Sequence, residues 1–383
     1  MAGRPRARPH GIDGLTRSGT LLVLGGGPAQ QPAIAAAHRL GVRTIVCDAL
    51  PGRGDVAVSS EDTAAVTALM AEADGAIAPG TDWPVRVAAE ACAAAGVHHP
   101  ISVATAVLAT DKLLQRARMA EAGVPQPAFS QDTAPAYPCV VKPADRQGQR
   151  GISVVATPDA LAPALELARA ASRSGRATVE ELIAGPEVTV NGFSVGGRFV
   201  SVAVTDREHF AGAFGVCHRH VLPARSGAAE ASAAAAAAVA ALGIADGPSY
   251  VQLVLGPHGP RVIEVAARLG GGFDSQLIRA ALGVDLAEAA VLAALGRPVD
   301  PASLVPTTPD RAGVIEFLRA PPGPLGRVSG PSGVRFYDAP GHVYSQLRIG
   351  PDRAGHVLAV ADDREAALAL AAEAVAAVRF EPA

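Results

Sequence analysis

The chain carries only two lysines, Lys112 and Lys142, whereas the other 31 of its 33 basic residues are arginines. Lys142 ends the apolar run VVK and is followed by a polar loop with two glycines, DRQGQRG, over residues 145–151. A lysine kept in so arginine-rich a chain indicates a position that needs a compact ammonium group rather than a planar fork. Glycines in such a loop allow backbone N–H groups to approach an anion, so the combination predicts a phosphate site. An ordinary hairpin loop is the alternative.

Three acidic residues follow in the segment VEELIAGPEVTV, namely Glu180, Glu181 and Glu187. The first two end one β-rich run, and the third begins another run after a Gly-Pro turn. These acids could therefore line one edge of a cleft. A solvated strand edge is the other interpretation of such a doublet.

The segment VIEVAARLGGG places Glu264 on a strand and Arg268 at the exit of that strand, just before three glycines. Because side chains alternate along a strand, Glu264 points to the opposite face from Ile263 and Val265. A carboxylate and a guanidinium so close in the sequence could form a simple salt bridge. They could equally hold a metal ion and a substrate carboxylate.

A glycine turn at residues 25–27 satisfies only part of a dinucleotide-binding motif, because Gln30 stands where the third glycine belongs. Asp48 lies at about the spacing expected of a ribose-binding acid. A nicotinamide-dependent dehydrogenase would also need a hydride-transfer site downstream, and the sequence contains no convincing one. We therefore expect no nicotinamide cofactor.

The elements around these residues begin with a strand, turn, helix and strand between residues 20 and 48, which predict a βαβ unit. A second strand and helix follow more weakly around residues 74–95. Ligands of open parallel sheets bind beyond the carboxyl ends of the strands. The loops at 25–30, 48–54 and 79–83 should therefore share one edge.

From Thr110 onward the pattern changes to a helix followed by β-rich runs. Two hairpins are predicted, one turning at residues 196–197 and the other at the GPHG segment, 256–259. A mixed α/β tail closes the chain, and the segment 362–380 has the composition of a final helix.

Composition limits the possible partners. The 383 residues are 49% hydrophobic and carry a net charge of -3, which offers no broad attraction to nucleic acid or anionic membranes. The alanine-rich segment from residue 228 is better explained as a packed helix than as a membrane span. No signal-peptide pattern follows the basic leader, so we expect a cytoplasmic protein. Four widely spaced cysteines indicate buried free thiols.

Taken in order, these segments resemble the ATP-grasp superfamily, particularly its carboxylate-amine ligases of the L-amino acid ligase type. The resemblance runs from about Leu21 to the C-terminus and rests on TDK, VVKPADRQGQRGI, VEELIAGPEVTV, HVLP and IEVAARLGGG. It implies an α/β ATP-grasp fold with a doubly wound pre-ATP-grasp domain, a small lid subdomain and a larger β-rich subdomain. The implied parts are a disordered leader (1–18), the pre-ATP-grasp domain (19–109), the lid subdomain with a connecting helix (110–185), the large subdomain (186–300) and a C-terminal α/β portion packed on it (301–383).

The same resemblance implies roles for individual residues. Lys142 would act in catalysis, Arg268 would hold a substrate carboxylate, and His220 would lie near the reacting groups. The two lysines would contact the nucleotide phosphates under a flap at 147–151, with an adenine hinge and a ribose-binding acid beyond. The implied nucleotide-binding residues are Lys112, Lys142, Gln147, Gly148, Gly151, Glu180, Glu181, Ile183 and Glu187.

For the metal, the resemblance implies that Glu264 binds Mg²⁺ and that Gln252 stands where a second acid is common. Ala266 likewise stands where the superfamily often has an asparagine. A neutral amide removes a negative charge from a divalent site. ATP phosphates and water, or another acid such as Asp274, could complete it.

The function implied by this resemblance is an ADP-forming ligase that uses ATP and Mg²⁺ to join a small carboxylate to an amine through an acyl phosphate. Its partners would be these small molecules, with neither nucleic acid nor membrane, and a homodimer is possible. A carboxylase that activates bicarbonate and a catalytically silent ATP-binding regulatory protein are the alternatives.

Overall fold

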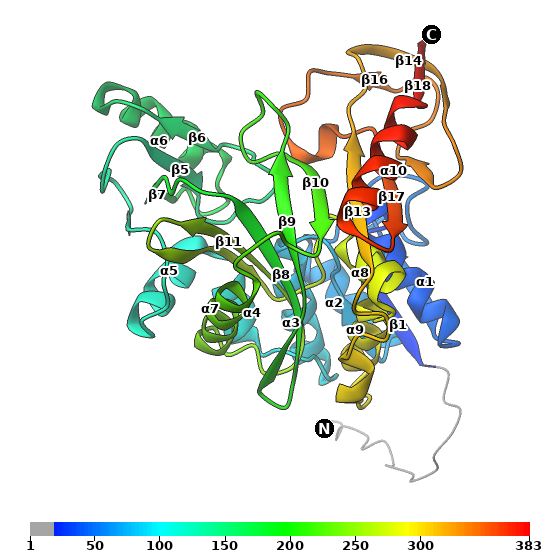
Figure 1. Ribbon diagram of the computed structural model, residues 1–383. Coiled ribbons are helices and arrows are strands. Elements are labelled where there is room, and N and C mark those ends of the chain that lie inside the picture. The colour runs from blue at the N-terminus through cyan, green and yellow to red at the C-terminus, as the bar shows by residue number, and fades with distance from the viewer. Residues whose placement is uncertain (1–18) are drawn as a thin grey trace, which may run out of the picture.

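The computed structural model describes residues 19–383, and the leader expected at residues 1–18 lies outside this range. The described chain combines helices with four β-sheets (Figure 1), which confirms the α/β class. None of the helices within residues 19–383 has the length and apolar character that a membrane span requires.

The N-terminal sheet is parallel, with the strand order β2-β1-β3. Its region contains β1 (Thr20–Leu24), α1 (Gln31–Arg39), β2 (Arg43–Cys47), α2 (Thr63–Leu69), β3 (Gly75–Ile77) and α3 (Trp83–Ala95). The loops that follow the three strands meet at one edge, where Gly26 contacts the backbone of Arg53 and Gly80 contacts Ala29. The shared edge expected for these loops is confirmed.

A four-stranded antiparallel sheet of order β4-β7-β5-β6 forms a separate lobe, at the upper left in Figure 1. Two helices lead into it, α4 (Val103–Ala109) and α5 (Lys112–Glu121). The lobe contains β4 (Phe129–Ser130), β5 (Cys139–Pro143), β6 (Ser153–Val155), α6 (Leu161–Ala171) and β7 (Ala177–Glu181). Helix α6 packs on the sheet through an apolar cluster that includes Val141, Leu165 and Val179.

An eight-stranded sheet of order β12-β11-β8-β9-β10-β13-β17-β15 is the largest element. Its strands are β8 (Glu187–Val195), β9 (Arg198–His209), β10 (Cys217–Leu222), β11 (Gly247–Gly256), β12 (Gly259–Ala266), β13 (Ala312–Leu318), β15 (Val334–Phe336) and β17 (Gly355–Ala361). The hairpins β8-β9 and β11-β12 turn where the sequence predicted. Strands beyond residue 300 continue this sheet. The domain boundaries that the family resemblance implies stay a prediction.

The remaining helices cover this sheet or follow it. They are α7 (Ala228–Ala241), α8 (Asp274–Leu282), α9 (Leu286–Ala294) and α10 (Arg364–Ala376). A small third antiparallel sheet has the order β16-β14-β18, with β14 (Gly323–Ser329), β16 (Val343–Tyr344) and β18 (Arg379–Pro382). The alanine-rich segment is thus a helix of 14 residues that packs against β9 and β12.

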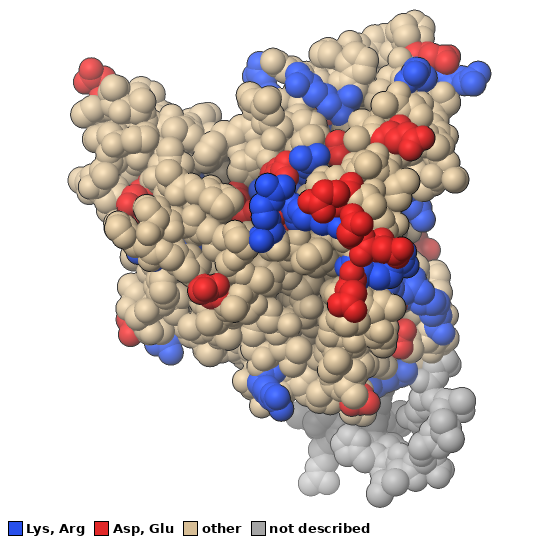
Figure 2. Space-filling model, viewed as in Figure 1, with Lys and Arg blue, Asp and Glu red and all other residues tan. Residues whose placement is uncertain are grey.

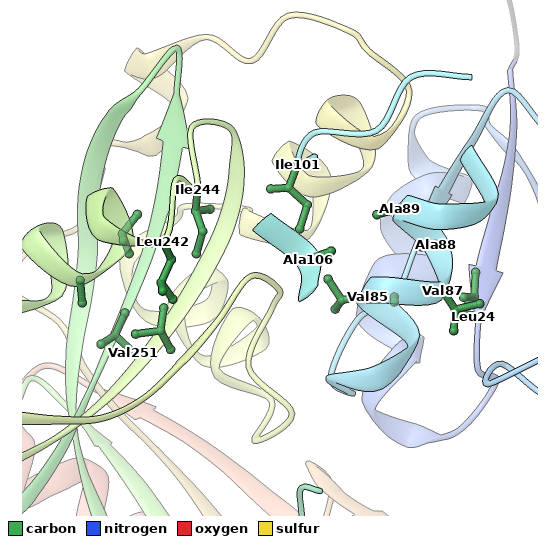
Figure 3. Packing of buried hydrophobic residues seen from close by; sticks show 14 of the residues in the cluster. Leu24, Val85, Val87, Ala88, Ala89, Ile101, Ala106, Leu242, Ile244 and Val251 are labelled. Atoms are coloured by element: carbon green, nitrogen blue, oxygen red, sulfur yellow. The ribbon is translucent and has the colours of Figure 1, made fainter. Parts of the chain in front are cut away.

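One apolar cluster joins the N-terminal sheet to the eight-stranded sheet (Figure 3). It extends from Leu24 and Val85 through Ile101, beside α4, to Leu242 and Val251. Burial of aliphatic side chains contributes roughly 1.5–3 kcal/mol each. The loops of the first sheet are therefore held firmly against the larger sheet.

Candidate active site

A cavity of about 450 Å³ lies where the N-terminal loops, the 145–151 loop and the eight-stranded sheet meet. On the outside, Figure 2 shows a notch between the α6 lobe and the C-terminal part, with acidic and basic side chains interspersed on the visible face. The predicted site residues that line the cavity are Lys112, Gln147, Gly148, His220, Gln252, Glu264 and Arg268. The predicted residues that do not line it are Lys142, Gly151, Glu180, Glu181, Ile183 and Glu187.

Lys112 connects three parts of the site. It is the first residue of α5, whose N-cap Asp111 accepts hydrogen bonds from two backbone N–H groups. Its Nζ lies 2.8 Å from Glu264 Oε1 and donates to the carbonyl oxygen of Arg146 at 2.7 Å. Burial alone would lower the pKa of Lys112, but Glu264 and Asp82 outweigh burial and raise it. Lys112 is therefore a charged group that ties the 145–151 loop to β12.

Glu264 and Gln252 face one another in register on β12 and β11. The Gln252 amide nitrogen donates to Glu187, which leaves the amide oxygen available. Burial alone would raise the pKa of Glu264, but Lys112 lowers it, so the carboxylate is ionised. Residues 19–383 hold no group of three or more His, Cys, Asp or Glu side chains arranged for a metal ion. Mg²⁺ commonly takes one or two protein oxygens and completes its shell with phosphate and water, so this pair fits it.

Lys142 belongs to a buried charge network. On adjacent strands β5 and β7, Lys142 Nζ lies 2.8 Å from Glu180 Oε2. Arg116 grips the same carboxylate with two nitrogens, at 3.0 and 2.9 Å, and also donates to the Val262 carbonyl oxygen at 2.7 Å. Burial alone would raise the pKa of Glu180, but Arg116 and Lys142 lower it to about 2. Glu180 is only 1% exposed, so it does not lie on a solvated strand edge.

Glu187, at the start of β8, is also paired within the protein. Arg207 Nη1 donates to Glu187 Oε1 at 2.7 Å, and His209 Nε2 lies 2.6 Å from Oε2. Burial alone would raise the pKa of Glu187, but Arg207 and His209 lower it. Glu187, Arg207 and Gln252 therefore form one connected polar group beside the cavity.

A Cys-His-Asp chain lies in and behind the cavity wall. Cys217 Sγ is 3.3 Å from His220 Nε2, and His220 Nδ1 is 3.3 Å from Asp274 Oδ1. A β-bulge at residue 218 places Cys217 and His220 on the same face of β10, although they are three residues apart. Burial alone would raise the pKa of Cys217, but His220 and Arg207 lower it. Burial alone would lower the pKa of His220, but Asp274 and Cys217 raise it.

The three glycines that follow Arg268 allow this chain of side chains to form. A Cβ atom on Gly272 would lie 2.4 Å from His220 Nε2 and 3.0 Å from Asp274 Oδ2. A side chain at this position would therefore displace His220 or Asp274. Gly271 likewise lies against the backbone of Gly80 in the N-terminal loops.

Arg268 lines the cavity, but it pairs with a different acid from Glu264, the partner that the sequence suggested. Its Nε and Nη2 atoms both lie 2.6 Å from Asp82 Oδ1, whereas Glu264 pairs with Lys112. The possibility of an Arg268–Glu264 bridge is thus wrong, because α5 brings a closer ammonium group. Gln147 of the flap accepts a hydrogen bond from the Asp82 backbone, so the flap rests on the same loop.

Sequence reasoning missed Arg116, Asp82 and Cys217. Arg116 is one arginine among many on an amphipathic helix, and its role depends on a partner 64 residues away. Asp82 stands in the loop at 79–83, for which the sequence predicts only a place at the edge of the N-terminal sheet. Cys217 was grouped with the other cysteines, which are all free and buried as predicted. No local signal in the sequence distinguishes these three residues from their neighbours of the same type.

Comparison with known families decides the broader assignment. The ATP-grasp domain model matches residues 135–276. The model for L-amino acid ligase C-terminal domain 2 matches residues 308–382. The chain therefore contains an ATP-grasp domain and an L-amino acid ligase C-terminal domain. The predicted resemblance to ATP-grasp ligases of the L-amino acid ligase type is confirmed.

Solved structures confirm the ATP-grasp fold. The L-amino acid ligase from Bacillus licheniformis matches with a TM-score of 0.81 and 19% identity, over 96% of this chain and 100% of that one. The biotin carboxylase domain of the Hydrogenobacter thermophilus 2-oxoglutarate carboxylase, solved as a dimer with MgADP and bicarbonate, matches with a TM-score of 0.77 and 16% identity, over 94% and 90%. At these identities the likeness establishes the fold.

A curated relative is the uncharacterized protein y4rH of Sinorhizobium fredii, which is 27% identical over 299 residues. The match covers 70% of this chain, and the chain spans about 60% of the length of this relative.

Proposed function

We propose that this ATP-grasp protein is an ADP-forming ligase that joins a small carboxylate to an amine through an acyl phosphate. The observation that carries the proposal is the single cavity that gathers Lys112, Glu264, Arg268 and His220 under the flap. The match of residues 308–382 to a ligase C-terminal domain supports an amide-forming reaction.

On the nucleotide side, we assign phosphate contacts to Lys112, Lys142 and the backbone of the flap. Lys142 is held by Glu180 within a network that already satisfies both, so its contact with phosphate would need a small movement into the cavity. The other proposed nucleotide contacts are Gln147, Gly148, Gly151, Glu180, Glu181, Ile183 and Glu187. Glu264 and the Gln252 amide oxygen would hold Mg²⁺, which neutralises charge on the phosphates.

The reaction has two steps. An oxygen of the substrate carboxylate attacks the γ-phosphorus, and the bond from that phosphorus to the β,γ-bridging oxygen breaks, giving an acyl phosphate and ADP. The amine nitrogen then attacks the acyl carbon, the carbon-oxygen bond to phosphate breaks, and the proton lost by the nitrogen goes to the departing phosphate, giving the amide and inorganic phosphate. The protein mainly positions the reactants and neutralises developing charge. A closed flap would keep water from the acyl phosphate.

His220 lies beside Asp274, whose negative charge raises the pKa of the imidazole against the opposing effect of burial. We assign it to stabilising negative charge on the departing phosphate. Arg268, fixed by Asp82, supplies a second positive charge at the same wall.

The proposal also covers assembly and location. A homodimer in the cytoplasm is the state we propose, in line with the dimer of one structural neighbour. Analytical ultracentrifugation of the full chain would check the assembly.

The test is a screen of ADP release with ATP, Mg²⁺ and pairs of amino acids and simple amines, followed by the mass of the product. Glu264→Gln should lower the rate about a hundredfold because it removes the ionised metal ligand. Glu121→Gln is the control, because Glu121 is exposed on the outer part of α5.

ADP release stimulated by bicarbonate without an amine would instead support a carboxylase. ATP binding without ADP release across the whole screen would support a regulatory protein. Full activity of Glu264→Gln would contradict the metal assignment.

A further inference from the structure

Cys217 differs from the other three cysteines of the chain in its surroundings. All four thiols are free and buried. Cys217 lines the cavity, whereas Cys47, Cys92 and Cys139 do not. Burial raises the pKa of these other three thiols, to about 11 for Cys92. A small molecule that enters the cavity therefore meets the thiol of Cys217.

The imidazole of His220 is placed to take the proton of this thiol. Its Nε2 atom lies 3.3 Å from Cys217 Sγ, and its Nδ1 atom lies 3.3 Å from Asp274 Oδ1. Asn191 donates to the same carboxylate oxygen at 3.3 Å. The carboxylate is thereby held beside the ring, where it stabilises the imidazolium that forms when the proton leaves sulfur. A nucleophile beside a base that a third group orients is the arrangement that activates a thiol.

Positive charge around the sulfur also favours the thiolate. Arg207 lines the same cavity as Cys217. Together with His220, it lowers the pKa of Cys217 against the opposing effect of burial. The thiolate is the nucleophilic form of cysteine, and reactive cysteines have electropositive, partly accessible surroundings of this kind.

We propose that Cys217 is a redox-sensitive thiol that hydrogen peroxide converts to a sulfenic acid inside the cavity. The thiolate sulfur attacks one peroxide oxygen, and the oxygen-oxygen bond breaks. The departing hydroxide takes the proton from the His220 imidazolium and leaves as water. The sulfur is oxidised by two electrons and the peroxide is reduced, so the step needs no further reactant.

The sulfenic acid would persist until a thiol from solution removes it. A second cysteine nearby would form a disulfide with it, but within residues 19–383 no other cysteine lines the cavity. One thiol of dithiothreitol would attack the oxidised sulfur and release water. The other thiol would then attack this mixed disulfide and restore the free cysteine.

Oxidation should also affect the reaction at this wall. The added oxygen lies beside His220, which the proposed mechanism places next to the departing phosphate. Oxidised protein should therefore release ADP more slowly. This consequence rests on the proposed ligase function, whereas the modification of Cys217 does not.

The experiment measures the oxidation of each cysteine in the native full chain. The protein is treated with hydrogen peroxide and then with dimedone, which traps sulfenic acids, and peptide masses give the labelled fraction of each cysteine over time. We expect Cys217 to be labelled about tenfold faster than Cys47, Cys92 and Cys139, or more. In urea-unfolded protein the four rates should become similar, because the difference depends on the fold.

His220→Gln tests the role of the imidazole. It should lower the labelling rate of Cys217 about tenfold, because an amide does not accept the thiol proton. His218→Gln is the matched control, since His218 lies on the same strand outside the cavity, with its Nε2 atom 3.2 Å from Glu316. Thermal unfolding shows whether both variants fold. If His220→Gln does not, the comparison of the four cysteines in the wild-type protein decides.

Similar rates for all four cysteines in the native protein, or no label on Cys217, would overturn the inference. An unchanged rate at Cys217 in folded His220→Gln would overturn it as well, because the imidazole would then not activate the thiol.

ADP release is measured separately, before and after peroxide. Peroxide should lower the wild-type rate, dithiothreitol should restore it, and Cys217→Ser should not respond to peroxide. Labelled wild-type protein with an undiminished rate would contradict the effect on catalysis. A protein that releases no ADP at all would contradict the ligase proposal and leave the labelling result valid.

Discussion

Two charged regions beside the cavity differ in how completely the protein satisfies them. Around Glu180, both carboxylate oxygens accept charge-assisted hydrogen bonds, from Arg116 and from Lys142. Around His220, two buried atoms, His220 Nδ1 and Asp274 Oδ2, have no hydrogen-bond partner within residues 19–383. The charges of the first region are satisfied within the protein, whereas the second region contains polar atoms that no group of the described protein satisfies.

This difference indicates where stability and function can be separated. Removing one member of a complete buried ion network leaves a buried charge and destabilises the fold. Unpaired polar atoms already cost the free protein some stability, so changing them should affect turnover more than folding. The following changes test that division, in order of expected size.

The largest effect is expected for Arg116→Met. The variant leaves Glu180 with a single cation and should lower the free energy of unfolding by about 3 kcal/mol, as measured by urea denaturation. Arg118→Met is the control on the same helix, because Arg118 is half exposed, forms an ion pair with the exposed Glu121 and donates one hydrogen bond to the Ala241 carbonyl oxygen. It should change the free energy of unfolding by less than about 1 kcal/mol. Equal losses in the two variants would show that the network is not a special source of stability.

The next effect is a loss of stability at low pH. The pKa of Glu180 falls from 4.5 to about 2 on folding, so its contribution is complete above pH 4.5 and is lost as the pH falls toward 2. That contribution is about 3 kcal/mol. Denaturation of Glu180→Gln over this range should give a shallower slope of unfolding free energy against pH than the wild type. Equal slopes in the variant and the wild type would show that Glu180 does not cause the pH dependence of stability.

The smallest effect is expected in the second region. Gly272→Ala places a methyl group against His220 and Asp274 and should lower kcat for ADP release about tenfold by shifting the imidazole. Stability should fall by only about 1 kcal/mol, because the ring can move toward the cavity. Gly330→Ala is the control, since Gly330 is exposed and outside the cavity. A large loss of stability with unchanged kcat would show that Gly272 contributes to folding and not to catalysis.

The sequence predicted the fold well where the information was local. Strand alternation and turn residues located both hairpins, and the two rare lysines marked one helix start and one buried strand. Family motifs then joined these pieces in the correct order. Each of these signals spans a few residues, so a single chain displays it without knowledge of long-range contacts.

Pairing partners could not be predicted in the same way. The Arg268–Asp82 contact joins residues 186 positions apart, and it depends on how the N-terminal loops dock against β12. The approach of Cys217 to His220 depends on a bulge whose register is fixed by β9. Such contacts follow from tertiary packing, which residue types alone do not specify.

The apolar cluster in Figure 3 has a consequence for shortened forms of this protein. Deleting the segment before residue 110 would remove the members of this cluster between Leu22 and Ala106 and expose apolar side chains of the remaining part to water. Such a fragment should aggregate rather than behave as an independent catalytic module. The N-terminal sheet is thus needed to keep the rest of the chain from aggregating, in addition to supplying loops that line the cavity.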